Sequence, residues 1–478
     1  MSKPAEDFDK SSVVNIHYLV NVVAVPITRK NAGMPALAAI DRSKTTPYGG
    51  LLLVEALCRR WYLWNHVDQE QLPAPQDTDL GPRPAESIMA QLLFSFARGG
   101  TSLAEAAMLR DDPLLLRLVG LRHAAEESTL NAWLAAQTET SIRELRKLNT
   151  ALVNSALQEC CPAKTEDKAN PLDIVMRATR WTISRETHAV VENGLPGVQL
   201  CWRSLGVGPF LLDGVWSENP GVAEHTAHFE ALVSKNYRIW EGYETYFSSG
   251  DLPDGVVWQK AVEMARFALW TAEVDRGTVY SGCNFDPDSQ QLRWKDAVSN
   301  DALAQHYCLI YPGTDRQTVV PGVVAVARRK DAEDQFYRHR FLVVPRNPGI
   351  SAQTWFVRHF LVKAPALQML DDLNLNRLLW LECNARAACF VIASLAYNLL
   401  TALRLLLLPK THWATREIIR GIITTPLTLS TSGRRDRGYL AVTPAWPAGW
   451  RELIESSMPG AVRRITRAPP TSHPELLQ

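Results

Sequence analysis

Residues 172–183 read LDIVMRATRWTI and directly follow a polar break, PAKTEDKANP at 162–171. β-branched and aromatic residues favour extended backbone, so this run predicts the first strand of a sheet. Further strands are expected at 189–191, 197–204, 209–216, 256–258, 278–283, 306–311, 318–327 and 338–345. Helical patterns at about 222–235 and 259–275 interrupt these strands. Strands mixed with helices predict an α/β layer from residue 172 to about residue 350.

The segments before this layer have a helical pattern, because their apolar residues recur every three or four positions. The expected helices cover 49–64, 85–98, 101–109, 112–118, 126–134 and 138–158. Ser128 is a candidate N-cap, since its hydroxyl can accept a hydrogen bond from the first helical turn. Four prolines make 65–84 a loop. Further upstream, VVNIHYLVNVVAVPI at 13–27 predicts one or two strands.

The helical pattern returns at 354–408, where the apolar run Ala387–Leu403 must be weighed as a membrane span. Its 17 residues are at the short end for crossing a bilayer, and Asn398 lies inside it. We therefore expect a buried core helix packed on the face of the sheet. Tyr397 and Asn398 should find hydrogen-bond partners there, because an unpaired buried polar group costs about 1–3 kcal/mol.

The composition is that of a folded soluble protein. The chain has 478 residues, a formal net charge of +1, 46% hydrophobic residues and 21% charged residues. This length suggests about three domains, and the composition excludes a wholly disordered, collagen-like or disulfide-scaffold chain. The near-zero charge excludes a uniformly basic, histone-like polymer, but it leaves open a nucleic-acid binder with local basic patches.

The cysteines and the N-terminus favour a cytoplasmic location. None of the eight cysteines forms a CxxC pair, and the adjacent Cys160 and Cys161 have poor geometry for a shared disulfide or zinc site. Reduced thiols are the simplest interpretation. The first residues, MSKPAEDFDKSS, are polar and mixed in charge, so no secretory signal is expected.

Several stretches stand in an order that resembles a known family. They are GGLLLVEAL at 49–57, SIMAQLLFSFARGGTSLAEAAMLRDDPLLLRLVG at 87–120, STLNAWL at 128–134, RHRFLVVPRN at 338–347 and LNLNRLLWLECNARAACFVIASLAYNLLTALR at 373–404. Together they resemble bacterial cut-and-paste insertion-sequence transposases of the IS-four superfamily. The resemblance implies an RNase H-like catalytic core, a helical DNA-binding domain and an activity in DNA transposition.

The resemblance also implies a division of the chain. An N-terminal β or extended segment covers 1–47, and a helical DNA-binding-like domain covers 48–161. An RNase H-like core, with a mixed sheet and a β-rich insertion at about 195–350, covers 172–408. A basic segment at 409–478 ends the chain.

The family's chemistry depends on a DDE triad. Two aspartates and a glutamate hold two Mg²⁺ ions, which activate water and stabilise the leaving 3′ oxygen. The family's first aspartate lies inside the first core strand, and the matching position here is Arg177 or Thr179. Asp173, at the start of the strand, is the nearest acid. An arginine at this position supplies a fixed positive charge, which repels Mg²⁺.

The other two triad positions also lack carboxylates. The second position falls at or beside Ala261, with Glu263 as the nearest acid. The third falls near Pro365 or Ala366, and a proline in the middle of a helix would break it. Asp371 follows a turn or two later. All three catalytic sites are therefore expected to be lost, with no bound metal or cofactor.

Arginine clusters are the candidate DNA contacts, because local Lys and Arg patches release counterions on binding to DNA. The candidates are Arg59, Arg60, Arg328, Arg329, Arg338, Arg340, Arg434, Arg435, Arg437 and Arg464. The expected partner is double-stranded DNA, with a homodimer or a protein partner left open, and no membrane.

The sequence thus predicts a degenerate transposase relative that binds DNA without cutting it. An active DDE transposase with an offset triad and bound Mg²⁺ is one alternative. A protein-interaction scaffold without DNA binding is the other, and the near-neutral charge favours it.

Overall fold

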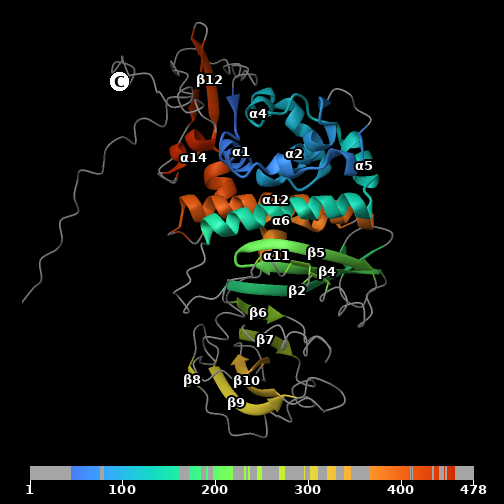
Figure 1. Cartoon of the computed structure of the whole chain (residues 1–478), viewed down its shortest axis with the longest axis vertical. Helices are drawn as coiled ribbons and strands as arrows, with labels where there is room; N and C mark the ends of the chain where they lie inside the picture. Colours follow the sequence, from blue (N-terminus) through green and yellow to red (C-terminus); the bar gives the residue numbers. More distant parts are fainter. Residues whose placement is uncertain are drawn as a thin grey trace, which may run out of the picture.

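The computed structural model is a mixed α/β fold built in layers, with helices at one end, two long helices across the middle and a sheet beneath them (Figure 1). It describes residues 45–75, 80–161, 172–184, 190–191, 197–218, 231–232, 235–236, 239, 245–249, 269–274, 295–296, 302–310, 320–329, 338–345, 365–379, 381–409, 411, 413–432, 435–440, 446 and 449–457. The segments predicted at 13–27, 256–258 and 278–283, and most of 222–235, lie outside the described residues.

The first layer consists of α1 (Leu51–Arg60), α2 (Pro84–Ala97), α3 (Leu103–Ala107), α4 (Pro113–Leu118) and α5 (Glu127–Ala135). Short 3-10 turns lie at Leu63–His66, Gln69–Gln71 and Met108–Asp111. The helices predicted from periodicity are confirmed, with two corrections. α1 ends at Arg60, because Tyr62 takes a left-handed φ of 50° before the next turn begins. Glu126, not Ser128, is the N-cap of α5, so Ser128 lies inside the helix.

The middle layer is formed by α6 (Glu139–Cys160) and α12 (Cys383–Leu407), which pack along each other (Figure 1). Every residue from Ala387 to Leu403 is buried, which confirms the predicted core helix. Among the described residues, α12 is the one helix long and apolar enough to cross a membrane. Because 78% of its apolar window is buried inside the protein, it is typical of the core helix of a soluble protein.

The sheet beneath has the strand order β5-β4-β2-β6-β7-β11-β10-β9-β8. Its strands are β2 (Leu172–Ile183), β4 (Val198–Val207), β5 (Phe210–Glu218), β6 (Thr245–Ser249), β7 (Leu269–Val274), β8 (Lys295–Asp296), β9 (Ala302–Ile310), β10 (Val320–Arg329) and β11 (Arg338–Pro345). β3 (Val190–Val191) pairs with β2 beside this path. Neighbouring strands are antiparallel from β5 through β4 to β2 and parallel from β2 through β6 to β7. From β7 through β11, β10 and β9 to β8, each pair is again antiparallel.

The strand predicted at 172–183 is confirmed, and it lies inside the sheet with a partner on each side. The helix predicted at 259–275 is wrong over residues 269–274, which form β7. The stretch LWTAEV has aromatic and β-branched residues, and pairing with β6 and β11 decides in favour of a strand. β6 was not predicted, because five residues are too few to show a period.

Two asparagines join the middle layer to edge strand β5. Asn398 of α12 accepts a hydrogen bond from the Leu211 N–H (2.8 Å) and donates to the Leu211 carbonyl (2.7 Å). Its amide also donates to Asn149 Oδ1 of α6 at 2.9 Å, and Asn149 donates to the Leu211 and Leu212 carbonyls. The predicted partners of Asn398 and Tyr397 are therefore confirmed, the latter donating to Gln368 Oε1 at 2.8 Å.

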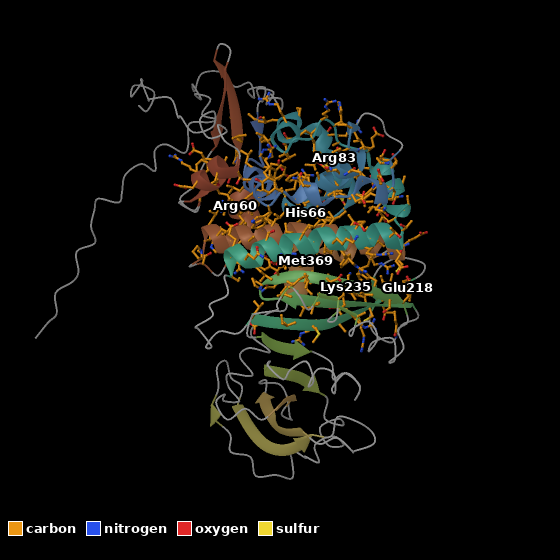
Figure 2. All side chains as sticks on the ribbon, viewed as in Figure 1. Arg60, His66, Arg83, Glu218, Lys235 and Met369 are labelled. Atoms are coloured by element: carbon orange, nitrogen blue, oxygen red, sulfur yellow. The ribbon has the colours of Figure 1, made fainter. Side chains whose placement is uncertain are left out.

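α12 packs on the sheet's face, as predicted, and it lies mainly over edge strand β5. Asn398 of α12 binds the edge strand β5. Phe390 contacts the face of the sheet, where its ring centroid lies 5.2 Å from that of Trp202 and 4.8 Å from that of Trp216. α11 (Pro365–Leu373) fills the space between α12 and the sheet, as Figure 2 shows for Met369.

The C-terminal elements close back on the first layer. They are α13 (Thr415–Ile418), a π-helical turn at Ile419–Ile423, β12 (Leu427–Ser432), β13 (Arg435–Leu440) and α14 (Trp450–Ser457). β12 pairs with β1 (Thr45–Thr46), and α14 packs on α1. At this junction Gly50 allows a close approach, because a Cβ there would lie 2.1 Å from the Ile422 carbonyl oxygen.

Candidate functional site

The face of the sheet that α12 covers contains the first expected triad position. Residues in direct register across neighbouring strands lie on the same face. Arg177 of β2 is in register with Ser204, and Thr179 with Trp202. Since Phe390 of α12 contacts Trp202, Arg177 and Thr179 lie on the helix-covered face. Both residues are half-buried.

The carboxylate nearest to Arg177 on this strand is too far away to replace it. Asp173 lies on the same face but four residues earlier, which is roughly 13 Å at about 3.3 Å per residue. Its carbonyl accepts a hydrogen bond from the Gly208 N–H at 2.6 Å, which fixes the start of the strand. Asp173 therefore lies beside the turn between β4 and β5 rather than at the position of Arg177.

The third expected position lies close to the first. Pro365 is the first residue of α11, and its ring lies 3.0 Å from where a Cβ of Gly206 would be. Gly206 is in register with Val175, which shares a face with Arg177. Within the described residues Pro365 does not interrupt the helix, which continues from it to Leu373.

The acids that follow on α11 serve another contact. Asp372 accepts a hydrogen bond from the Thr415 N–H at 3.0 Å and lies 3.6 Å from Arg416, so it caps α13. Asp371 is exposed, and its carbonyl is a partner of Arg416. Six residues separate Asp371 from Pro365, which is about 9 Å along a helix. These carboxylates therefore lie away from Arg177.

Two of the three expected triad positions offer no ligand for a metal ion. Mg²⁺ is held by oxygen ligands, and neither the guanidinium of Arg177 nor the ring of Pro365 offers one. Within the described ranges, no three His, Cys, Asp or Glu side chains are grouped closely enough to hold a metal ion. Ala261 and Glu263, which mark the second expected position, lie outside the described residues.

A cluster of tryptophans lies on the same face of the sheet. The amino-acid composition of the chain did not predict its position. Trp216 stacks between Trp181 and Trp202, with ring centroids 5.5 and 6.0 Å apart. Arg386 lies over the Trp216 ring at 5.1 Å and donates to the carbonyls of Leu379 and Leu381. Burial lowers the pKa of Arg386. Trp202 and Trp216 are buried, so these rings build the core and do not form a platform for nucleic-acid bases.

The first two arginines of the expected DNA surface are paired within the protein. Arg60 forms an ion pair with Glu159 at 2.7 Å and donates to Ser456 at 3.2 Å, so it fastens α1 to α6 and α14. Figure 2 shows Arg60 at this junction. Arg59 donates to Glu55 at 2.6 Å. Burial raises the pKa of Glu55 to about 7, against the opposing effect of Arg59.

Arg122, two positions after Gly120, is a basic residue that was not among the candidate DNA contacts. A Cβ at Gly120 would lie 3.8 Å from Arg59 Nη2, and a Cβ at Gly81 would lie 3.7 Å from Arg122 Cδ. Both glycines have a left-handed φ, which turns the chain beside these side chains. Arg122 is exposed. The signal available in the sequence was a glycine followed closely by basic residues at the end of a helix.

The remaining arginines fall on two β-ribbons. Arg329 of β10 is in register with Arg338 of β11, and Ala327 with Arg340, so these three arginine positions share one face. Arg328 belongs to the other face. Like charges directly opposite each other destabilise a strand pair unless an anion offsets them.

The second ribbon is β12–β13, at the opposite end of the molecule from β10 (Figure 1). Arg435 is in register with Ser432, and Arg437 with Ser430, so both arginines lie in strand β13. Arg434 and Arg464 lie outside the described residues. The expected arginines therefore do not gather into one patch.

No protein-family model matches the chain, and no curated protein matches it.

Proposed function

We propose that this chain is a catalytically degenerate relative of insertion-sequence transposases that binds double-stranded DNA without cutting it. The observation that carries the proposal is the order and direction of five strands. β2, β4 and β5 form an antiparallel meander, and β6 and β7 then add parallel to the free side of β2. This arrangement is the one expected of an RNase H-like core, with β8–β11 as a β-rich insertion that begins after Val274.

The position of Arg177 supports the loss of catalysis. β2 runs parallel to β6, and Met176 is in register with Ser249 at the carboxyl end of β6. Ligands of parallel sheets bind outside the carboxyl ends of the strands. Arg177 follows Met176, so the fixed positive charge stands where the first metal-binding aspartate would be needed.

Under this proposal, the second triad position is assigned to a different residue than in the sequence analysis. β6 ends at Ser249, so the position is expected directly after this residue rather than at Ala261. Asp251 is the acid that the sequence places there. A single carboxylate beside the guanidinium of Arg177 does not make up a site for two Mg²⁺ ions.

Two further features support a cytoplasmic DNA-binding protein. None of the six cysteines whose side chains the structure describes forms a disulfide, which is typical of the bacterial cytoplasm. The arginine positions of β10–β11 and β12–β13 offer charge for the DNA backbone. A protein-interaction scaffold remains the competing function, and it predicts no affinity for duplex DNA.

The test combines a cleavage assay with a binding assay on the full chain. Supercoiled and short linear duplex DNA should be neither nicked nor joined in Mg²⁺ or Mn²⁺, whereas fluorescence anisotropy should report duplex binding that weakens as salt rises. Metal-dependent nicking that disappears in Asp173→Ala, Glu263→Ala or Asp251→Asn would establish the active transposase instead. A lack of duplex binding at low salt would leave the scaffold function.

A further inference from the structure

The β12–β13 ribbon has two faces of different chemistry. Thr428 is in register with Tyr439, Ser430 with Arg437, and Ser432 with Arg435. We call these six positions the hydroxyl–arginine face. The alternate pairs are Leu427 with Leu440, Leu429 with Gly438, and Thr431 with Asp436, and we call them the opposite face.

The base of the ribbon shows which face is directed towards the protein. Leu427, on the opposite face, is fully buried, and its register partner in β1, Thr46, is 1% exposed. Thr46 donates a hydrogen bond to Asp112 at the start of α4. Thr428 and its partner Thr45, on the hydroxyl–arginine face, are only half-buried. The opposite face is thus directed towards the helical layer at the base.

The residue types on the hydroxyl–arginine face suit a polyanion. All six positions hold side chains that donate hydrogen bonds: two arginines, three hydroxyl residues and a tyrosine. The only acid in the two strands, Asp436, belongs to the opposite face. Arginine binds phosphate in a bidentate manner, and Ser, Thr and Tyr side chains are common donors to DNA phosphates.

The shape of the element agrees with this chemistry. The ribbon projects from the end of the molecule (Figure 1), and a two-stranded β-ribbon is narrow enough to enter the major groove of B-DNA. β13 is also the outer strand of the three-stranded sheet β1-β12-β13. Within the described residues, no strand pairs with the far side of β13.

We propose that the hydroxyl–arginine face of the β12–β13 ribbon binds the phosphate backbone of duplex DNA. This inference rests on the proposed function and assigns it a surface. Since each phosphate contact contributes about 0.9 to the slope of log K against log salt, two arginine contacts contribute about 2. Arg59 and Arg60, at the end of α1, then contribute less than the sequence suggested, because both side chains have partners within the protein.

The test measures anisotropy of a labelled duplex with the full chain over a range of salt. Arg435→Gln with Arg437→Gln should weaken binding at low salt and lower the slope by about 2. Arg435→Lys with Arg437→Lys keeps both charges, so its slope should stay close to that of the wild type. Thermal melts show whether each variant folds. If the glutamine double variant does not fold, the salt slope of the lysine double variant is compared with that of the wild type instead.

Two single variants form a matched control, because they add the same charge at adjacent positions of one strand. Ser430→Glu places a carboxylate on the hydroxyl–arginine face and should weaken binding, whereas Thr431→Glu places it on the opposite face and should not. Equal loss in both variants, or wild-type affinity and slope in the glutamine pair, overturns the ribbon proposal. Duplex binding by the wild type in that case leaves the proposed function standing. Failure of the wild type to bind any duplex overturns both.

Discussion

Replacing Asn398 by alanine should lower stability more than any surface change on the same helix. Asn398 is fully buried and makes three hydrogen bonds to the edge of the sheet and to α6. The variant removes the acceptor of the Leu211 N–H and the donor to Asn149 Oδ1, while the Leu211 carbonyl keeps its bond from Asn149. Each buried group left unpaired costs about 1–3 kcal/mol, so the expected loss is about 2–6 kcal/mol.

A loss of this size is measurable, because the total stability of a domain is about 5–15 kcal/mol. Urea unfolding followed by tryptophan fluorescence is the assay, since the buried Trp202 and Trp216 lie in β4 and β5 of the sheet that Asn398 binds. Asn384→Ala is the matched control on α12, because its amide makes one bond, to the Gln137 carbonyl at 3.1 Å, and the residue is exposed. A loss for Asn398→Ala no larger than that for Asn384→Ala would refute the role of the asparagine pair.

Three further changes test other parts of the structure. Burial raises the pKa of Glu55 from 4.5 to about 7, so the folded state binds a proton more tightly than the unfolded state. The stability of the wild type should therefore fall between pH 4.5 and pH 7. The urea midpoint of Glu55→Gln should not show this decline. Asp213→Ala leaves the half-buried Arg146 without its carboxylate partner at 3.2 Å and should cost about 1–3 kcal/mol in urea unfolding. Gly50→Ala places a Cβ 2.1 Å from the Ile422 carbonyl oxygen, and a thermal melt should show a lower midpoint.

Each of these changes has a control. Glu127→Gln, at an exposed carboxyl, should keep the pH dependence that Glu55→Gln loses. Glu144→Ala breaks a half-exposed pair with Lys147, which is expected to contribute only about 0–1 kcal/mol. Gly449→Ala adds a Cβ 3.4 Å from a leucine side chain, which is an ordinary contact. If a control matches its test variant, the contact named for that variant is not what sets the stability.

The helices of the first layer and α12 follow from the sequence alone. Their apolar residues recur with the helical period over nine or more residues in α1, α2, α5, α6 and α12, so local patterns specify both type and extent. β2 was equally clear from its β-branched run. The burial of Ala387–Leu403 also followed from its composition and from Asn398 within it, because a polar amide in an apolar helix needs a partner.

The sheet order and the environment of each charge were decided only by tertiary structure. The stretch at 269–274 is a strand because β6 and β11 supply hydrogen-bond partners on both sides, which no local pattern records. Arg60 ends an apolar helix and is exposed, yet Glu159, 99 residues later, binds it. Strand register likewise separates Arg435 and Arg437 from Asp436, although the three are adjacent in the chain. Side chains in a strand alternate between faces, so neighbours in sequence meet different surroundings, and distant segments supply their partners.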